Sequence, residues 1–275
     1  MAKRVNSTIN KYARQSFLGE DSQERISHAK VAIIGLGGGG SHIVQQLAHL
    51  GFQNYLLLDP DRIDETNLNR LVSGTIADVE NGMYKVDIAK RTIVRLCSNS
   101  RVEAYVEKWH NKLDELKECD LIFGCVEGFI QRRDVEAFAR RFLIPFIDIG
   151  MDVHSIDEEV PRIAGQIILS MPGYACMNCI RFLTDENLKK EASRYGDAGG
   201  NPQVVWSNGI LASVAVGLAI DLITDWSKTL RTAVFLSYDG NDNTVKQDNR
   251  MQFINLNECS HYPLKEIGEP KFRPI

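Results

Sequence analysis

The hydrophobic residues of the chain form two kinds of run, short continuous ones and longer ones with helical spacing. Residues 31–34 are all apolar and residues 56–58 are three leucines, as expected for strands buried on both faces. Between them, residues 43–50 place apolar side chains at helical spacing, and Gly51 follows as a helix C-cap. These runs predict a strand–turn–helix–strand unit over residues 30–60.

The same alternation continues to about residue 150 and then changes. Further strands are predicted at 102–106, 120–126, 145–150, 162–171 and 233–238, and further helices at 85–96, 130–142 and 209–223. Alternating strands and helices favour a mostly parallel sheet with right-handed crossovers. The expected fold class is therefore α/β, with a doubly wound, Rossmann-like sheet.

The remaining segments are more polar. Residues 1–28 are expected to form a helical lead-in, with an amphipathic helix over 7–27, and residues 61–84 a loop with short helices. The glycine-rich stretch 184–203 is expected to be a mobile crossover loop, and 263–275 an extended tail. All of these segments fit within one domain spanning residues 1–275.

Composition narrows the possible functions. The chain is 44% hydrophobic and 25% charged, which is ordinary for a soluble globular protein, and its net charge of −4 disfavours general nucleic-acid binding. No signal peptide is visible, and the apolar run 209–223 is too short for a bilayer, so no membrane association is expected. Six cysteines without a secretory signal indicate a reducing compartment and a cytoplasmic location.

Glycines follow the first predicted strand. Gly35, Gly37 and Gly40 fit the pattern G-x-G-x-x-G, with Gly38 beside them, and Asp59 ends the second strand. Such glycines permit a tight turn and the close approach of a phosphate, and the following helix directs unpaired N–H groups toward it. Asp59 is expected to accept hydrogen bonds from ribose hydroxyls.

Several motifs resemble those of one known family. Their order is that of the ThiF/MoeB family: Arg14-Gln15, Gly35 to Gly40, Asp59-Pro60-Asp61, Asn67-Leu68-Asn69-Arg70, Lys85 and Cys176-x-x-Cys179. This family includes the adenylation domains of ubiquitin-activating enzymes, and the resemblance extends over about residues 10–261. It implies a sheet extended by antiparallel strands, usually in a homodimer. It also implies ATP-dependent adenylation of the C-terminal glycine carboxylate of a ubiquitin-like carrier protein.

The charged residues of these motifs suit that chemistry. Adenylation brings two anions together, so cations are needed at fixed positions. Arg70 is expected to clamp phosphate oxygens, Asn67 to hold a phosphate or ribose oxygen, and Lys85 to stabilise charge at the α-phosphate. Taken singly, Arg70 and Lys85 would be read as solvated surface charges. The resemblance assigns Asp61 to the nucleotide site as well, and places Arg14 at the ATP of a neighbouring subunit.

The resemblance also implies a magnesium ligand after the strand at 121–126. The family has an aspartate there, whereas this chain has Glu127, which is one methylene longer. Glu127 is still expected to bind magnesium, since carboxylate oxygens are its usual protein ligands. Arg132 matches a common family arginine, and we expect it to orient Glu127 or a phosphate.

A second metal site is indicated by cysteine spacing. Cys176 and Cys179 have the spacing of zinc ligands, and the resemblance implies a second pair near the C terminus, where this chain has Cys259 and His261. Three cysteines and one histidine form a chemically sound tetrahedral zinc site of a structural kind. A redox pair and two buried thiols remain as alternatives.

The remaining thiols bear on the reaction that follows adenylation. No cysteine lies between Cys179 and Cys259, where relatives with a thioester step carry theirs, and Cys97, Cys119 and Cys125 are in or near predicted elements. We therefore predict adenylation without an enzyme thioester, with transfer to an external acceptor such as a sulfur donor or a conjugation partner enzyme. Short activators of this kind occur in bacterial ubiquitin-like conjugation systems.

Two other functions remain open. Glu127 and the missing thiol are compatible with a catalytically weak scaffold subunit of a conjugation complex. The glycine turn and Asp59 are also compatible with an NAD-dependent oxidoreductase, although Arg70 and Lys85 would then have no task.

Overall fold

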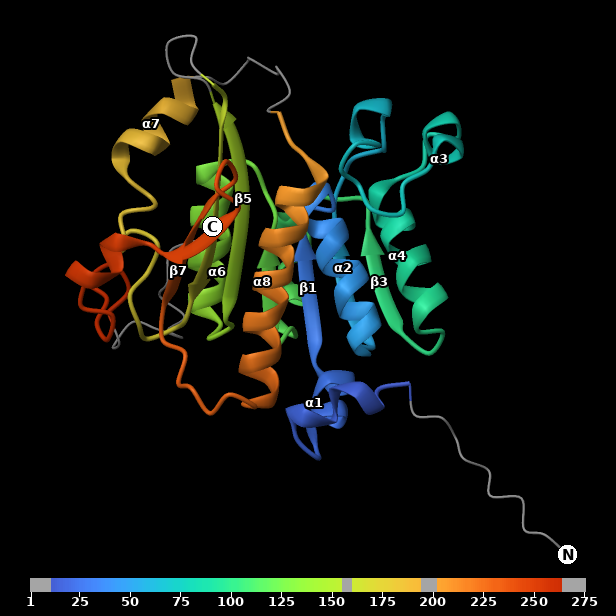
Figure 1. Ribbon diagram of the computed structural model, residues 1–275, viewed down its shortest axis with the longest axis horizontal. Helices are drawn as coiled ribbons and strands as arrows, with labels where there is room; N and C mark the ends of the chain where they lie inside the picture. Colours follow the sequence, from blue (N-terminus) through green and yellow to red (C-terminus); the bar gives the residue numbers. More distant parts are fainter. Residues whose placement is uncertain (1–10, 155–159, 194–201, 264–275) are drawn as a thin grey trace, which may run out of the picture.

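The computed structural model describes residues 11–154, 160–193 and 202–263. An eight-stranded sheet crosses it in the order β3-β2-β1-β4-β5-β6-β7-β8 (Figure 1). The parallel part consists of β1 (Lys30–Ile34), β2 (Asn54–Leu58), β3 (Arg101–Tyr105), β4 (Leu121–Gly124) and β5 (Phe146–His154). Antiparallel pairing then adds β6 (Arg162–Ser170), β7 (Val234–Asp239) and β8 (Thr244–Gln247). The expected doubly wound sheet with an antiparallel extension is confirmed.

Helices cover both faces of the sheet and bury two cores. On one face lie α2 (Gly38–Leu50), α4 (Lys85–Leu96) and α8 (Val205–Thr224), and on the other α5 (Leu113–Lys117) and α6 (Phe129–Arg141). Successive strand residues alternate between the cores, so Ile33 belongs to the first and Ala32 to the second. This explains why the strand sequences are continuously apolar.

The predicted helix over residues 7–27 is wrong in part over residues 11–27, the portion of it that the structure describes. In its place are a 3₁₀ helix, η1 (Ala13–Leu18), and a short helix, α1 (Ser22–His28). Gly19 separates them with a φ of 114°, a conformation that an α-helix cannot continue through and that glycine adopts without strain.

The segment 61–84 is a loop with short helices, as predicted: η2 (Glu65–Asn67) and α3 (Ile76–Glu80). Further short helices are η3 (Trp109–Lys112) and η4 (Asn249–Phe253). The predicted loop 184–203 is corrected, because α7 (Asp185–Ser193) occupies its first half. Its acidic first residues, Asp185 and Glu186, are a helix-start signal. Residues 194–201 of that loop and residues 264–275 of the predicted tail (263–275) lie outside the described residues.

Helix α8 is longer than predicted. Its 20 residues are enough to cross a bilayer by length and composition, and it is the only such helix among the described residues. The expectation that the apolar run 209–223 is too short for a bilayer is therefore wrong, because the helix that contains it spans Val205–Thr224. Most of α8 is nevertheless buried within the fold, against α2 and strands β5 and β6, as in the core helix of a soluble protein.

Candidate active site and metal centre

The strand order of the sheet reverses between β1 and β4, because β2 and β3 lie on one side of β1, whereas β4 and β5 lie on the other. Ile34 at the end of β1 pairs with Leu58 of β2 on one side and Gly124 of β4 on the other. In a doubly wound fold, the crevice outside the carboxyl ends of such strands is where ligands bind. The segments that follow these three strands carry the glycine turn, Asp59 and Glu127, so the fold brings the predicted nucleotide residues to one edge.

The glycine turn is closely packed at Gly35 and Gly40 and open at Gly37. Gly35 has a φ of 88°, and a Cβ there would collide with the backbone of Cys125. A Cβ on Gly40 would collide with the carbonyl oxygen of Gly35. A Cβ on Gly37, by contrast, would have no neighbour within 4 Å. The first turn of α2 is therefore accessible to a ligand at Gly37, where its free N–H groups favour an anion.

A side chain from α8 that was not predicted from the sequence packs on this turn. Asn208 is 4% exposed and lies directly over Gly38, where any Cβ would collide with its amide. Its Nδ2 atom donates to the carbonyl oxygen of Val204, 3.1 Å away. Because the contact between Asn208 and Gly38 joins positions far apart in the sequence, no local pattern indicates it.

Asp59 supports the turn as well as facing the crevice. Its Oδ2 accepts a 2.6 Å hydrogen bond from the N–H of Leu36, and its Oδ1 accepts a 2.8 Å bond from that of Asp61. Asp59 is buried, and burial raises the pKa of its carboxyl group. The structural role of Asp59 was not expected, and its contact with a ribose stays a prediction.

A continuous set of contacts then leads to Lys85, the first residue of α4. The Lys85 ammonium lies 2.9 Å from the Asp61 carboxylate, and the Lys85 N–H donates to the Asp61 carbonyl oxygen at 3.0 Å. Leu36, Asp59, Asp61 and Lys85 are thus linked in order, which places a cation beside the glycine turn. A small cavity lined by Leu36, Ser41 and Lys85 also shows their proximity.

Asn67 is the last residue of η2, and Arg70 lies on the turn that follows this helix. The Arg70 guanidinium donates to the Thr66 carbonyl oxygen at 2.6 Å and to the Asn69 side chain at 3.1 Å, and no described carboxylate pairs with it. Asn67 is buried and donates to Asp64, whereas Arg70 is partly exposed. The turn is fastened to α2, since the N–H two residues after Arg70 donates to Ser41 Oγ.

Glu127 is exposed just after β4, with Gln203 Nε2 3.4 Å from its Oε1. The expectation for Arg132 is corrected. Arg132 is 5% exposed and donates to the Asp148 carboxylate and the Val126 carbonyl oxygen, so it fixes the backbone before Glu127 rather than touching that side chain. Burial outweighs this arginine and raises the pKa of Asp148 to about 6.

Arg14 lies far from the glycine turn within one chain. It is exposed on η1, and the neighbouring Gln15 donates to the carbonyl oxygen of Leu50, at the C-terminal end of α2. The glycine turn is at the other end of that helix, about 20 Å away by the rise of an α-helix. Contact between Arg14 and a nucleotide at the glycine turn would therefore require a second subunit.

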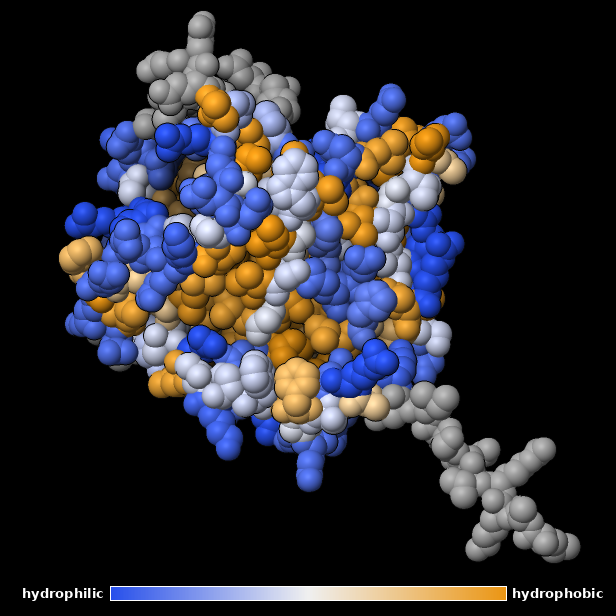
Figure 2. All heavy atoms as spheres, in the orientation of Figure 1, coloured by the Kyte–Doolittle hydropathy of each residue, from blue (hydrophilic) through white to orange (hydrophobic). Residues whose placement is uncertain are grey.

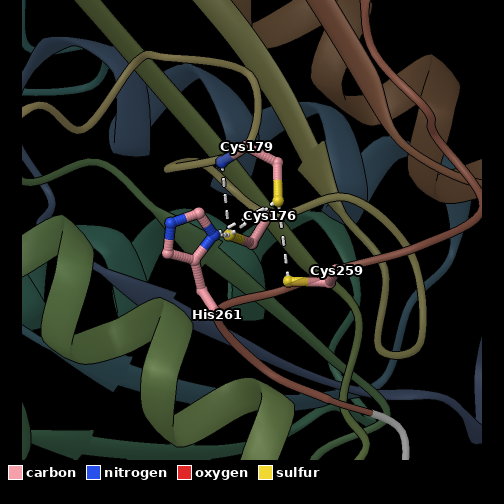
Figure 3. Close-up of side chains that lie close together, drawn as sticks. All are labelled: Cys176, Cys179, Cys259 and His261. Atoms are coloured by element: carbon pink, nitrogen blue, oxygen red, sulfur yellow. Dashed lines mark hydrogen bonds between the residues drawn. The ribbon is translucent and has the colours of Figure 1, made fainter.

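The four predicted zinc ligands meet in one cluster (Figure 3). Cys176 and Cys179 follow β6, while Cys259 and His261 come from the C-terminal segment. The Sγ atoms of Cys176 and Cys179 are 3.6 Å apart, and those of Cys179 and Cys259 are 3.7 Å apart. His261 Nδ1 lies 3.5 Å from Cys176 Sγ and 3.3 Å from Cys179 Sγ.

These distances fit a tetrahedral zinc site. Zinc–sulfur bonds of about 2.3 Å and zinc–nitrogen bonds of about 2.05 Å would separate ligand atoms by about 3.8 Å and about 3.6 Å. All four ligand atoms lie within 4.8 Å of one another. His261 thus completes the donor set, although its one-residue spacing from Cys259 is tight.

The other cysteines are poor nucleophiles. Cys97 and Cys119 are buried, and burial raises the pKa of Cys119 to about 12 and that of Cys125 further still. No thiol of the described residues outside the metal cluster is therefore prepared for a thioester step. A cavity of about 1010 Å³ lies over β6, β7 and β8 and includes none of the predicted nucleotide residues.

An open helix N-terminus at the switch point of a doubly wound sheet, with cations beside it, defines a nucleotide-binding α/β protein. The chain belongs to the ThiF family, whose model matches residues 10–261. The resemblance inferred from the motifs is confirmed.

Two curated relatives illustrate the range of the family. Ubiquitin-like modifier-activating enzyme 5 of Drosophila persimilis is 26% identical over 171 residues, which are 57% of this chain and 42% of the relative. The sulfur carrier protein adenylyltransferase of Thermus thermophilus is 33% identical over 129 residues, 45% of this chain and 47% of the relative. The chain therefore spans less than half of the length of these relatives.

Solved structures share the fold. E. coli MccB in a crystal with ATP superposes with a TM-score of 0.74 at 22% identity, covering 91% of this chain and 74% of MccB. At this level of identity, the similarity is evidence for the fold alone.

Proposed function

We propose that this protein is an ATP-dependent adenylyltransferase that activates the C-terminal carboxylate of a ubiquitin-like carrier protein. The observation that carries the proposal is the link from the glycine turn through Asp59 and Asp61 to Lys85, with Arg70 on a turn fastened to α2. An NAD site would need only the glycine turn and an acid, whereas a triphosphate also needs cations.

The reaction uses the chain's own charges. A carboxylate oxygen of the carrier attacks the α-phosphorus of ATP, and the bond to the bridging oxygen breaks, so that pyrophosphate leaves with the electron pair. The helix N–H groups at Gly37 hold phosphate oxygens, and Lys85 and Arg70 stabilise the charge that accumulates on them. Arg70 is suited to phosphate binding because no carboxylate among the described residues pairs with its guanidinium and would have to be displaced.

Glu127 is exposed at the same edge and offers oxygen ligands, which suit magnesium. When bound, magnesium would act as a Lewis acid toward the phosphate oxygens. The cluster of Cys176, Cys179, Cys259 and His261 would hold a structural zinc ion, joining the segment after β6 to the C-terminal segment.

We also propose that the protein is a homodimer in which Arg14 of one subunit contacts the ATP bound to the other subunit. A single chain leaves apolar surface uncovered over α8 and β7 (Figure 2). Ile210 and Val214 of α8 and Leu236 of β7 are among the partly buried apolar residues of these elements. Such a surface is typical of a subunit interface. The acyl-adenylate would pass to an external acceptor in the cytoplasm, where free cysteines persist.

ATP–pyrophosphate exchange tests the proposal. Exchange is expected only when a carrier ending in glycine is added, and a thiol-sensitive carrier adduct is not expected. Carrier binding without exchange would instead indicate a scaffold subunit, and binding of NADH without ATP binding would indicate an oxidoreductase. A carrier adduct that thiols cleave, and that disappears in Cys125→Ala, would contradict the absence of an enzyme thioester.

A further inference from the structure

Three charged residues form a buried row along one face of α6. Arg132, Glu136 and Arg140 follow one another at intervals of four residues and are 5%, 0% and 0% exposed. Charged side chains this deeply buried are uncommon unless each has partners. The partners at the C-terminal end of the helix belong to the loop that carries Cys176, and those at the N-terminal end lie beside Glu127.

The C-terminal part of the row holds the loop that carries the first two metal ligands. Arg140 donates to the carbonyl oxygens of Tyr174 and Ala175, each at 2.9 Å. Glu136 accepts a 2.8 Å hydrogen bond from the N–H of Met177. The backbone is therefore held immediately before and immediately after Cys176.

Ser170, at the end of β6, joins the two charges. Its hydroxyl donates to Glu136 Oε1 at 2.6 Å and accepts from Arg140 Nη2 at 2.8 Å. The guanidinium and carboxylate themselves lie 3.5 Å apart. Breaking a buried charge pair of this kind is costly, because the remaining charge is left without a partner. The metal loop therefore cannot move away from α6 without stranding both charges.

The N-terminal end of the same helix faces the candidate active site. Arg132 holds the carbonyl oxygen of Val126, directly before Glu127, and its own N–H donates to Gly128, directly after it. A helix is a stiff element, so a displacement at Arg140 is transmitted along α6 to the residues on either side of Glu127.

We propose that Glu136 and Arg140 are positioning residues that hold the metal loop and couple the metal centre, through α6 and Arg132, to Glu127. The coupling half of this inference rests on the proposed nucleotide site. Thermodynamic linkage then requires reciprocity: a nucleotide bound with magnesium at Glu127 must raise the affinity for zinc by the same factor by which zinc raises the affinity for the nucleotide.

Zinc extraction by a chromogenic chelator tests the positioning role without any activity assay. Arg140→Lys keeps the charge opposite Glu136 but loses the planar fork that reaches two carbonyl groups and Ser170. We expect zinc to leave this variant at least tenfold faster than wild type. Arg133→Lys, an equivalent change at an exposed arginine of α6, should leave the rate unchanged. Ser170→Ala, which removes only one hydroxyl, should act in the same direction and serves if Arg140→Lys does not fold.

The coupling is tested by titrating the bound zinc to equilibrium with a competing chelator, with and without magnesium and ATP. Wild type should hold zinc several-fold more tightly when nucleotide is bound, and Arg140→Lys should lose that protection. Equal extraction rates in Arg140→Lys and wild type, or a wild-type protein that binds no zinc, would overturn the positioning role. Calorimetry of ATP binding separates the two proposals: wild type that binds ATP without protecting zinc overturns the coupling, whereas wild type that binds no ATP overturns the proposed function.

Discussion

The ammonium of Lys85 and the carboxylate of Asp61 form a 2.9 Å salt bridge at the edge of the candidate nucleotide site. The lysine side chain is 13% exposed and the aspartate side chain 62% exposed. A pair that is open to water on one side contributes little to stability. On the proposed mechanism, a phosphate would therefore replace Asp61 as the partner of Lys85 at small cost.

Lys85→Ala should reduce carrier-dependent ATP–pyrophosphate exchange by about a hundredfold or more, because removal of one preorganised electrostatic contact typically has this effect. The loss should appear mainly in kcat, since the charge being stabilised grows in the transition state. Lys90→Ala removes an exposed lysine of the same helix and should leave exchange unchanged. Equal rates for Lys85→Ala and wild type would remove Lys85 from the mechanism.

Mixing two inactive variants tests whether Arg14 acts across a dimer. Arg14→Ala and Arg70→Ala should each be inactive alone. In a mixed dimer, the subunit with Arg70 intact receives Arg14 from its partner, so one of the two sites is complete. Random mixing should then restore about a quarter of wild-type exchange.

The variants must be unfolded and refolded together, or co-expressed, so that subunits exchange. Arg14→Ala mixed with itself provides the control and should stay inactive. If the mixed sample also stays inactive although analytical ultracentrifugation finds dimers, Arg14 does not reach the partner's site. A monomer would exclude the arrangement altogether.

The elements of the fold were largely predictable because their signals are local. The helix at 85–96 has helical spacing throughout and matches α4 at both ends. The continuous apolar runs at 31–34 and 56–58 reflect burial on both faces of a parallel sheet. The lead-in was misjudged because Gly19 breaks a pattern that is otherwise amphipathic.

The supporting residues of the site were not predictable in the same way. Asn208 over Gly38 is a contact between elements far apart in the sequence, and Asp148 pairs with Arg132 only because β5 packs beside α6. Arg140 and Glu136 would be read from sequence as a solvated pair on a helix, since charges spaced by four are common there. Only the three-dimensional packing places that pair in the core. The candidate zinc ligands, by contrast, were predictable: Cys176 and Cys179 have a recognisable spacing, and the family resemblance indicated Cys259 and His261.

Glu127 should control the magnesium requirement. Glu127→Gln keeps the size of the side chain and removes its charge, so we expect the magnesium concentration for half-maximal exchange to rise about tenfold. Glu127→Asp restores the carboxylate of the family pattern and should remain within a few-fold of wild type. A magnesium titration of all three proteins at fixed ATP decides the matter. Identical curves for Glu127→Gln and wild type would assign magnesium binding to other groups.

The metal cluster should contain one zinc ion per chain, measured by mass spectrometry after dialysis. His261→Ala leaves three ligands and should lower the zinc content and the melting temperature, because the binding energy of a structural zinc contributes to folding. Cys97→Ala alters a cysteine outside the cluster and should keep full zinc content. Full zinc content in His261→Ala would show that the histidine is not a ligand.

Asp78 and Arg91 fasten the loop that joins Arg70 to Lys85. Arg91 Nη1 and Nη2 lie 2.5 Å and 2.7 Å from the two carboxylate oxygens of Asp78, and Arg91 also donates to the Ser73 carbonyl oxygen at 2.9 Å. Asp78 in addition closes a capping box with Thr75 at the start of α3. The arginine first, and then Thr75, lower the pKa of the Asp78 carboxyl to about 2.

A carboxyl group whose pKa is lower in the folded than in the unfolded protein stabilises folding above its unfolded value, near 4. That stability is lost as the pH falls through the folded value, near 2. Asp78→Asn should therefore cost about 2 kcal/mol of unfolding free energy at pH 7, and the deficit should shrink by pH 3. Urea denaturation of wild type and Asp78→Asn at pH 7 and at pH 3 measures this loss of unfolding free energy. Asp87→Asn, a change at an exposed residue of α4, provides the control. A deficit of the same size at both pH values would mean that the ion pair is not its source.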